Sequence, residues 1–138
     1  MTVKQKNKTL ATLLAASAGS IGAHRFYLHG WRDKWGWLHF SSLPLSVIID
    51  QVFFGLPGLF AYGLFILSFL TAVIEALTIG LTADEKWDAI YHPHGEYVSA
   101  SNWPLALLLV FTVGIGAIAL IAVLARTFDL LYTGGAYG

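Results

Sequence analysis

Long apolar stretches separated by short polar segments dominate the chain. Residues 51–74 and 104–125 contain no Asp, Glu, Lys or Arg, and each is long enough to cross a hydrocarbon core, which needs roughly 20 residues. Residues 35–54 carry Asp50 as their one charge and are also predicted to span. The pattern therefore predicts an all-α integral membrane bundle of three to four transmembrane helices.

Breaks in the apolar pattern predict where these helices end. The cluster Gly55-Leu56-Pro57-Gly58 favours a tight turn, so helices 35–54 and 57–81 are expected to form an antiparallel hairpin. In the interfacial segment 82–94, Trp87, Ile90 and Tyr91 recur at helical spacing, which predicts a short helix lying on the membrane surface. A last helix of about residues 103–126 and a short tail follow, so residues 95–138 add to a domain over residues 1–94.

The first apolar segment, residues 9–23, is short for a span and follows lysines at positions 4, 6 and 8. With Ala16-Ser17-Ala18, it also imitates a secretory signal with a cleavage site. Extended through Leu28 it predicts a helix over residues 9–28. If that helix crosses the membrane, the eight Lys and Arg residues divide evenly between the two sides. If it enters and returns, the division is seven to one, which the positive-inside rule favours.

Composition supports a membrane protein and removes several function classes. Hydrophobic residues make up 57% of the chain and charged residues 12%, whereas soluble domains carry about 25% charged residues. A net charge of zero argues against nucleic-acid binding, and the absence of cysteine removes thiol chemistry. The five histidines have no HExxH-like spacing. We expect no enzymatic activity, metal, cofactor or small-molecule substrate.

Small residues repeat at every fourth position in two of the predicted helices. In lipid, such faces let helix backbones approach closely and gain dispersion contacts. They are expected to pack within the chain, against another membrane protein or against a second copy. The two faces consist of Ala11, Ala15, Gly19 and Ala23, and of Ser68, Ala72, Ala76 and Gly80.

Two carboxylates, Asp50 and Glu75, fall inside apolar segments, where a charge costs about 2.5–3.5 kcal/mol on insertion scales. The hairpin places Glu75 at the end of the bundle where Arg25, His24 and His39 are expected, and we predict that Glu75 pairs with Arg25. Asp50 is expected roughly 20 Å away in depth, so the two carboxylates cannot share a proton or a metal. Lys8 and Arg126 are the candidate partners of Asp50.

Three motifs together resemble the TM2-domain family, also called NINE-type membrane proteins in bacteria. They are the turn Gly22-Ala23-His24-Arg25-Phe26-Tyr27-Leu28-His29-Gly30, the acidic residue Glu75 near the end of a later apolar helix, and the polar tail 82–93. The resemblance covers residues 6–94 and departs from the family at His29, where the family has glycine. It implies a membrane domain in the bacterial cytoplasmic (inner) membrane and no settled biochemical activity.

Two functions fit these features. The first is a non-catalytic small integral membrane protein, an accessory or assembly subunit that packs against a larger membrane complex. The second is a homo-oligomeric conduit for protons or small cations, lined by a polar cluster of Glu75, His39 and Asp50. The expected partners are therefore the lipid bilayer and either another membrane protein or further copies of this chain.

Overall fold

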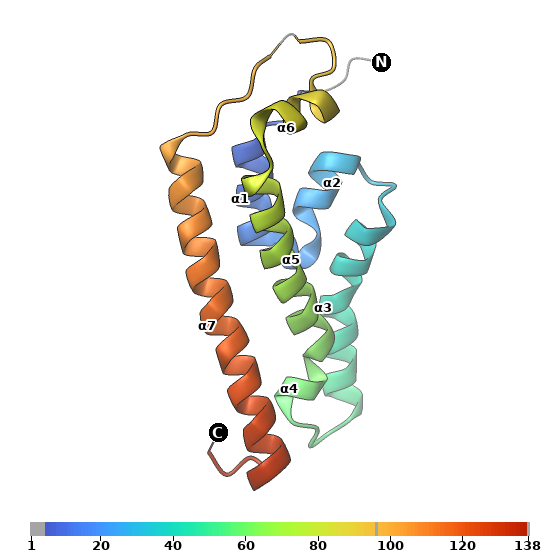
Figure 1. Ribbon diagram of the computed structural model, residues 1–138. Helices are drawn as coiled ribbons and strands as arrows, with labels where there is room; N and C mark the ends of the chain where they lie inside the picture. The colour runs from blue at the N-terminus through green and yellow to red at the C-terminus, as the bar shows by residue number, and fades with distance from the viewer. Residues whose placement is uncertain (1–4, 96, 138) are drawn as a thin grey trace.

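The computed structural model describes residues 5–95 and 97–137, and its regular elements there are all helical (Figure 1). This confirms the all-α prediction. The elements are α1 (Lys8–Ala18), the 3₁₀ turn η1 (Gly19–Ile21), α2 (Ala23–His29), α3 (Lys34–Val52), α4 (Gly58–Ala61), α5 (Gly63–Leu81), α6 (Asp84–Tyr91) and α7 (Trp103–Thr133).

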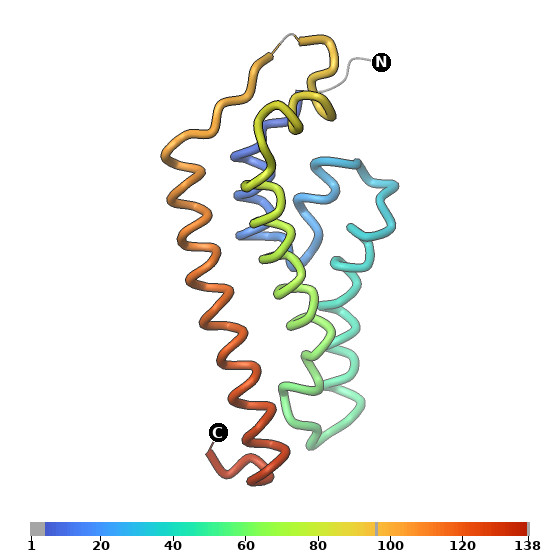
Figure 2. Tube along the Cα trace, viewed as in Figure 1, coloured from blue at the N-terminus to red at the C-terminus, as the bar shows by residue number. Residues whose placement is uncertain are grey.

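Helix α5 is the central element of the bundle. It contacts α1, α3 and α7, and it runs antiparallel to both α3 and α7 (Figures 1 and 2). The short helix α6 lies across the end at which α1 begins and α2 ends, and α4 lies at the opposite end (Figure 1). The bundle therefore has an α6 end and an α4 end, and these names are used below.

The first apolar segment is not the single helix predicted over residues 9–28. Helix α1 ends at Ala18, η1 follows, and the chain reverses at Gly22 so that α2 returns to the α6 end (Figure 2). Gly22 has a φ of 79°, and a Cβ atom there would lie 2.5 Å from the carbonyl oxygen of Gly36. Only glycine suits both the left-handed backbone and this close approach. The path corresponds to the alternative in which the segment enters and returns.

The helices of the predicted hairpin have close to the expected bounds. Helix α3 begins after Asp33, whose side chain accepts a hydrogen bond from the Gly36 amide at 3.1 Å and so caps the helix. The connection between α3 and α5 is longer than predicted, because the short helix α4 lies between Pro57 and the start of α5. Helix α7 ends at Thr133, beyond the predicted residue 126, since Arg126 pairs with Asp129 one turn further along.

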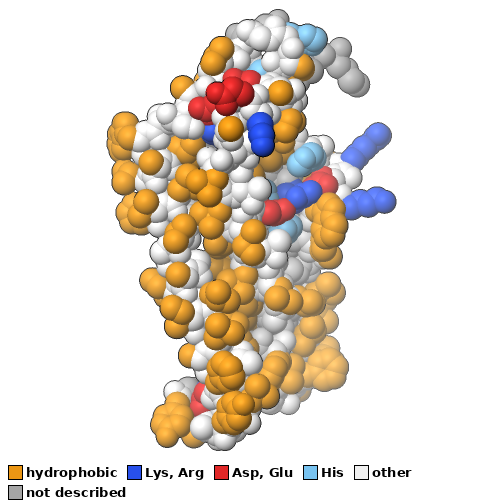
Figure 3. All heavy atoms as spheres, viewed as in Figure 1, with side chains coloured by type: hydrophobic (Ala, Val, Ile, Leu, Met, Phe, Trp, Pro, Cys, Tyr) orange, Lys and Arg blue, Asp and Glu red, His pale blue; other side chains and the backbone are white. Residues whose placement is uncertain are grey.

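The interior is more polar than the surface. Among the buried residues, the apolar ones are mostly alanines, and the polar ones include Lys8, Thr12, His24, His39 and Ser46. Large apolar side chains lie on the outside of α3, α5 and α7, and in Figure 3 they cover the face below the α6 end. Bundles that fold in water bury their large apolar residues, so this distribution is inverted.

Two helices of the described residues, α5 and α7, are long and apolar enough to cross a membrane by length and composition. Helix α3, the third predicted span, does not meet this criterion. Its inward positions His39, Ser42 and Ser46 are polar, whereas its outward positions, such as Leu38 and Ile48, are apolar. The low hydropathy of α3 comes from these inward positions together with Lys34, Asp50 and Gln51 at its two ends.

A candidate charged cluster between helices α2, α3 and α5

Glu75 of α5 is the centre of a partly buried polar cluster near the α6 end. Its Oε1 atom lies 2.6 Å from Arg25 Nη1. Its Oε2 atom lies 2.7 Å from His24 Nε2 and 3.3 Å from His39 Nε2. We call these four residues the Glu75 cluster. It brings together α2, α3 and α5 around one carboxylate, and it joins the two residues, Arg25 and Glu75, that the sequence predicts to pair.

Small residues make this convergence sterically allowed. A Cβ atom on Gly19 would lie 2.7 Å from the Cβ of Ala72 and 3.3 Å from His24 Nδ1, so η1 approaches α5 to backbone distance. Ala72 and Ala76 flank Glu75 on the same helix and are also buried. The short side chains leave room for the His24 imidazole, which is 1% exposed, directly beneath the turn.

Arg25 connects this carboxylate to a second one. Its Nε atom donates a hydrogen bond to Asp33 Oδ2 at 2.7 Å while Nη1 bonds Glu75. The hydrogen bond from the Arg25 guanidinium lowers the pKa of Asp33, with the Gly36 amide contributing in the same direction. Because Asp33 also caps α3, one arginine links the start of α3 to the end of α5.

His39 connects Ser68 to the Glu75 carboxylate. The Ser68 hydroxyl lies 2.6 Å from the Ser20 carbonyl oxygen and 2.7 Å from His39 Nδ1. The other ring nitrogen, Nε2, lies 3.3 Å from Glu75 Oε2. One histidine of α3 therefore joins a hydroxyl of α5 to the carboxylate two turns further along the same helix.

The His24 ring is bonded on one side only. Its Nε2 atom lies 2.7 Å from Glu75 Oε2. Its Nδ1 atom is buried and has no hydrogen-bond partner among the described residues. The carboxylate of Glu75 is therefore the one polar partner of this imidazole in the described part of the chain.

The two aromatic residues of the 22–30 motif lie outside the Glu75 cluster. Phe26 stacks on Trp31 with ring centroids 5.0 Å apart. The Tyr27 hydroxyl accepts a hydrogen bond from the Asn7 amide at 2.9 Å, and the Tyr27 carbonyl accepts one from Lys6. Both residues thus hold α2 against its neighbours rather than contact Glu75.

Asp50 lies at the α4 end, far from Glu75, where the Tyr62 hydroxyl approaches its Oδ2 atom at 3.5 Å. Both partners predicted for Asp50 are wrong. Lys8 pairs with Asp84, and Arg126 pairs with Asp129. Lys8 could lie level with Asp50 only if the first segment crossed the whole bundle, and the reversal at Gly22 keeps it at the α6 end. Arg126 instead pairs with a residue of its own helix.

The two ladders of small residues have different outcomes. Ser68, Ala72, Ala76 and Gly80 are all buried along α5. A Cβ atom on Gly80 would lie 2.5 Å from a Leu109 methyl group of α7 and 3.2 Å from Thr12 of α1. In the first ladder Ala11 and Ala15 are buried on α1, but Gly19 belongs to η1 and Ala23 begins α2. The ladder is therefore not one continuous helix face.

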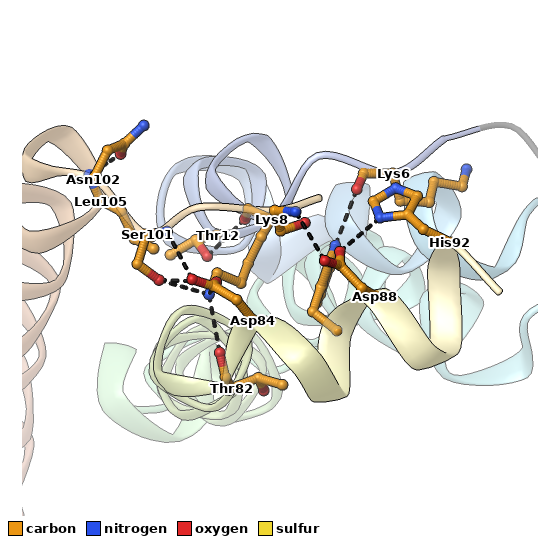
Figure 4. Close-up of polar contacts among 12 residues, drawn as sticks. Lys6, Lys8, Thr12, Thr82, Asp84, Asp88, His92, Ser101, Asn102 and Leu105 are labelled. Carbon is orange, nitrogen blue, oxygen red and sulfur yellow. Dashed lines mark hydrogen bonds and ion pairs between the residues drawn. The ribbon is translucent and has the colours of Figure 1, made fainter. Parts of the chain in front are cut away.

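A second polar assembly, absent from the sequence predictions, lies at the α6 end (Figure 4). The buried Lys8 ammonium donates to the Thr82 carbonyl at 2.9 Å, to the Ser101 hydroxyl at 2.8 Å and to Asp84. Asp84 also accepts from the Ser101 amide at 2.9 Å. All three donors of the ammonium thus have acceptors.

Helix α6 repeats the arrangement of a carboxylate bonded to the segment before α7 one turn after Asp84. Asp88 accepts from the Ser99 amide at 2.8 Å and from His92 Nδ1 at 2.8 Å. Residues i and i+4 of a helix are about 6 Å apart along the axis, and residues i and i+2 of an extended chain about 6.6 Å. Two carboxylates of α6 therefore match two amides of the extended segment before α7. We call Lys8, Asp84, Asp88, His92, Ser99 and Ser101 the α6 clasp.

These contacts change how both carboxyl groups ionise. The hydrogen bond from Lys8 lowers the pKa of Asp84, assisted by Ser101. The hydrogen bonds from Ser99 and then His92 lower the pKa of Asp88 to about 2. The sequence signal was the pair of aspartates at i and i+4, which is also the ordinary pattern of a solvated helix face.

The residues of α6 that were predicted to share one apolar face differ in their exposure. Trp87 is 2% exposed, and its Nε1 atom donates to the Lys6 carbonyl at 3.0 Å. Ile90, expected on the same buried face, is 64% exposed. Trp87 thus packs against the N-terminal part of the chain, because it has a hydrogen-bond acceptor there.

Comparison with protein-family models, with curated proteins and with solved structures finds no match. Within residues 5–95 and 97–137 there is also no group of three or more His, Cys, Asp or Glu residues placed to hold a metal ion. The resemblance to the TM2-domain family stays a prediction that rests on the 22–30 turn, Glu75 and the polar tail. The geometry itself defines an all-helical bundle with an apolar exterior and two polar assemblies near one end.

Proposed function

We propose that this protein is a non-catalytic integral membrane protein that acts as an accessory or assembly subunit of a larger membrane complex. The main observation in support is the inverted distribution of side chains, with small and polar groups inside and large apolar groups outside. Burying leucine offers no net gain when the solvent is lipid, so helices pack through small residues and hydrogen bonds instead. The α1–α5 contact has this character.

The outward face of α3 supports three spanning helices. Trp37, Leu38, Leu45 and Ile48 are exposed on α3, and its polar side chains face α5 or η1, as in the bond between His39 and Ser68. Helix α3 has 19 residues, which at 1.5 Å per residue is roughly 28 Å, close to the thickness of the hydrocarbon core. Helices α3, α5 and α7 are the proposed spans, and α1 with α2 forms a re-entrant pair.

The charge distribution gives the proposed orientation. Of the Lys and Arg residues in the described part of the chain, Arg126 alone lies on the half of α7 next to the α4 end. The others belong to segments at or near the α6 end: Lys6, Lys8, Arg25, Arg32, Lys34 and Lys86. The positive-inside rule then places the α6 end in the cytoplasm. With the family resemblance, this supports the bacterial cytoplasmic membrane as the location.

Helix α7 supports the proposal of a protein partner. It contacts α5 and α1, yet Leu105, Thr112 and Gly116 are its only buried residues in the described range. Its 31 residues extend roughly 46 Å, so most of a long helix surface is available for other helices. In this proposal the Glu75 cluster closes the fold by holding α2, α3 and α5 together.

The test is the native mass of the protein extracted gently from its own membrane, with every co-migrating chain identified. A stoichiometric larger partner is the expected result. A protein that migrates alone, or only with copies of itself, across several mild detergents would overturn the accessory role while leaving membrane insertion intact.

A second function, a homo-oligomeric conduit for protons or small cations, is favoured by the contact between His39 Nε2 and the Glu75 carboxylate at 3.3 Å. Further polar side chains, Ser42, Ser46 and finally Asp50, follow on the same helix toward the α4 end. Proton flux into vesicles containing the purified chain distinguishes this function. If the chain is a conduit, Glu75→Gln should abolish flux in a folded protein. An absence of flux in the unsubstituted protein would refute the conduit function.

A further inference from the structure

The corner between α2 and α3 presents two cations and two tryptophans to the surroundings. Trp31 is 74% exposed and Trp35 61% exposed. Arg32 and Lys34 alternate with them, are exposed, and make no ion pair with any residue that the structure describes. Figure 3 shows Lys and Arg side chains extending outward near the α6 end of the molecule.

The residue between the two cations does not neutralise them. Asp33 points inward, where it accepts from Arg25 Nε at 2.7 Å and from the Gly36 amide at 3.1 Å. Its carboxylate is therefore bonded to Arg25 and to the backbone, and not to Arg32 or Lys34. The corner keeps two cations without an ion-pair partner among the described residues, and the cap that Asp33 provides holds their backbone in place.

The aromatic rings behind the corner make it a preformed surface. Phe26 stacks on Trp31 at 5.0 Å, and Trp37 meets Phe26 edge-on at 5.5 Å. The Trp37 indole N–H donates to the Trp31 carbonyl at 2.8 Å, which fixes the turn itself. Ordered side chains lose less entropy on binding than mobile ones, so this corner is suited to bind a ligand.

We propose that the α2–α3 corner is a binding site for an anionic phospholipid headgroup. Arg32 and Lys34 bind the phosphate, and Trp31 and Trp35 lie at the headgroup level, where amphipathic rings are favoured. The apolar outer face of α3 continues directly from Trp35 to Leu38, so an acyl chain finds apolar surface next to the cations. A soluble acidic partner would leave that surface uncovered. The proposal rests on the membrane location proposed above.

The test uses the protein's own fluorescence in lipid nanodiscs. Three of its five tryptophans, Trp31, Trp35 and Trp37, lie at this corner. The full chain is reconstituted in phosphatidylcholine containing a minor fraction of phosphatidylglycerol, with the bromine quencher on the acyl chains of one lipid or the other. Quenching by brominated phosphatidylglycerol should exceed the amount expected from its mole fraction.

Removing the cations should remove this excess. Each Lys or Arg near an anionic surface contributes about 1 kcal/mol, so Arg32→Gln and Lys34→Gln should each weaken the apparent affinity for phosphatidylglycerol roughly fivefold. Lys86→Gln, which removes a cation of α6 at the same end, is the matched control and should leave the excess unchanged. Raising the salt concentration should reduce the excess in the unsubstituted protein.

The outcomes separate this site from the proposed function. Equal quenching by both brominated lipids, in proportion to their mole fractions, would refute the headgroup site in a protein that is nonetheless in the bilayer. A loss of the excess in Lys86→Gln as large as in Arg32→Gln would refute the assignment to this corner. Quenching by neither lipid would refute membrane insertion and the site with it.

Discussion

The Glu75 cluster and the α6 clasp combine carboxylates with cations in two different settings. In the cluster, three donors from α2 and α3 meet one carboxylate inside a bundle of closely packed small residues. In the clasp, Asp84 and Asp88 hold an extended segment at the end of the bundle, where solvent reaches both carboxylates. The same chemistry therefore holds helices together in one region and attaches a connecting segment in the other.

The difference teaches which part of the fold a charge supports. Side-chain exposure is similar in the two regions, at 23% for Glu75, 27% for Asp84 and 20% for Asp88, so burial does not separate them. Glu75 joins three helices, whereas Asp88 joins α6 to the segment before α7. We therefore expect substitution of Glu75 to affect the whole bundle and substitution of Asp88 to act locally. Lys8, which is 4% exposed, is the member of the clasp whose charge would be costly to leave unpaired.

The largest effect is expected for Glu75→Gln. This change leaves His24 and His39 without a carboxylate and Arg25 with Asp33 alone. It should lower the free energy of unfolding by about 3 kcal/mol, the low end of the range for a broken buried pair, since Glu75 is partly exposed. Unfolding in mixed detergent micelles measures it. Glu85→Gln, an exposed acidic residue on α6, is the control; equal losses in the two variants would contradict the comparison.

A substitution that touches no charge shows how much the close helix packing contributes by itself. A Cβ atom on Gly116 of α7 would lie 2.5 Å from the stiff side chain of Val73 on α5, so Gly116→Ala should destabilise by about 1–3 kcal/mol through overpacking. A Cβ atom added to Gly114, two residues earlier, would have no atom of another element within 4 Å. Gly114→Ala should therefore be neutral or slightly stabilising, as alanine is in a helix. The same micelle titration measures both.

Acid should open the α6 clasp before it disturbs the bundle. An Asp carboxyl has an ordinary pKa of 3.8, and the bonds from Ser99 and His92 lower the pKa of Asp88 to about 2. The folded state thus favours the ionised form, so the stabilisation is present above about pH 4 and is lost as the pH falls toward 2. Amide-exchange protection factors of Ser99 and Ser101 should fall across this window.

The smallest expected effect is that of Asp88→Asn at neutral pH. Because Asp88 bonds only its own helix and the segment before α7, its loss should leave the global unfolding of the bundle close to that of the unsubstituted protein while it lowers the protection of the Ser99 amide. Exchange measured at pH 7 separates the two readouts. A global loss comparable to that of Glu75→Gln would show that the clasp holds the helices together as well.

Individual residues show what could be predicted. The helix bounds near 35–54 and 57–81 followed from uncharged runs and a Gly-Pro break, which are local features. The closeness of Glu75 and Arg25 followed from the hairpin length and from the first segment ending where the second begins, and the structure places their side chains 2.6 Å apart. A reversal of the first segment was one of two alternatives, but its position at Gly22 was not predicted, because a glycine in a run of small residues is equally typical of a helix face. The α6 clasp depends on residues as distant as Lys8 and Ser101.

The sequence by itself determined the all-helical class, the apolar segments and the set of residues able to carry charge inside them. These properties follow from hydropathy and periodicity, which act over one or two helical turns. Only the tertiary structure decided that the first segment reverses, that Lys8 pairs with Asp84 rather than Asp50, and that Trp87 faces inward. The physical reason is that each of these depends on which backbone lies within a few ångströms of Gly22, Lys8 or Trp87, and that proximity arises from the packing of segments far apart in the chain.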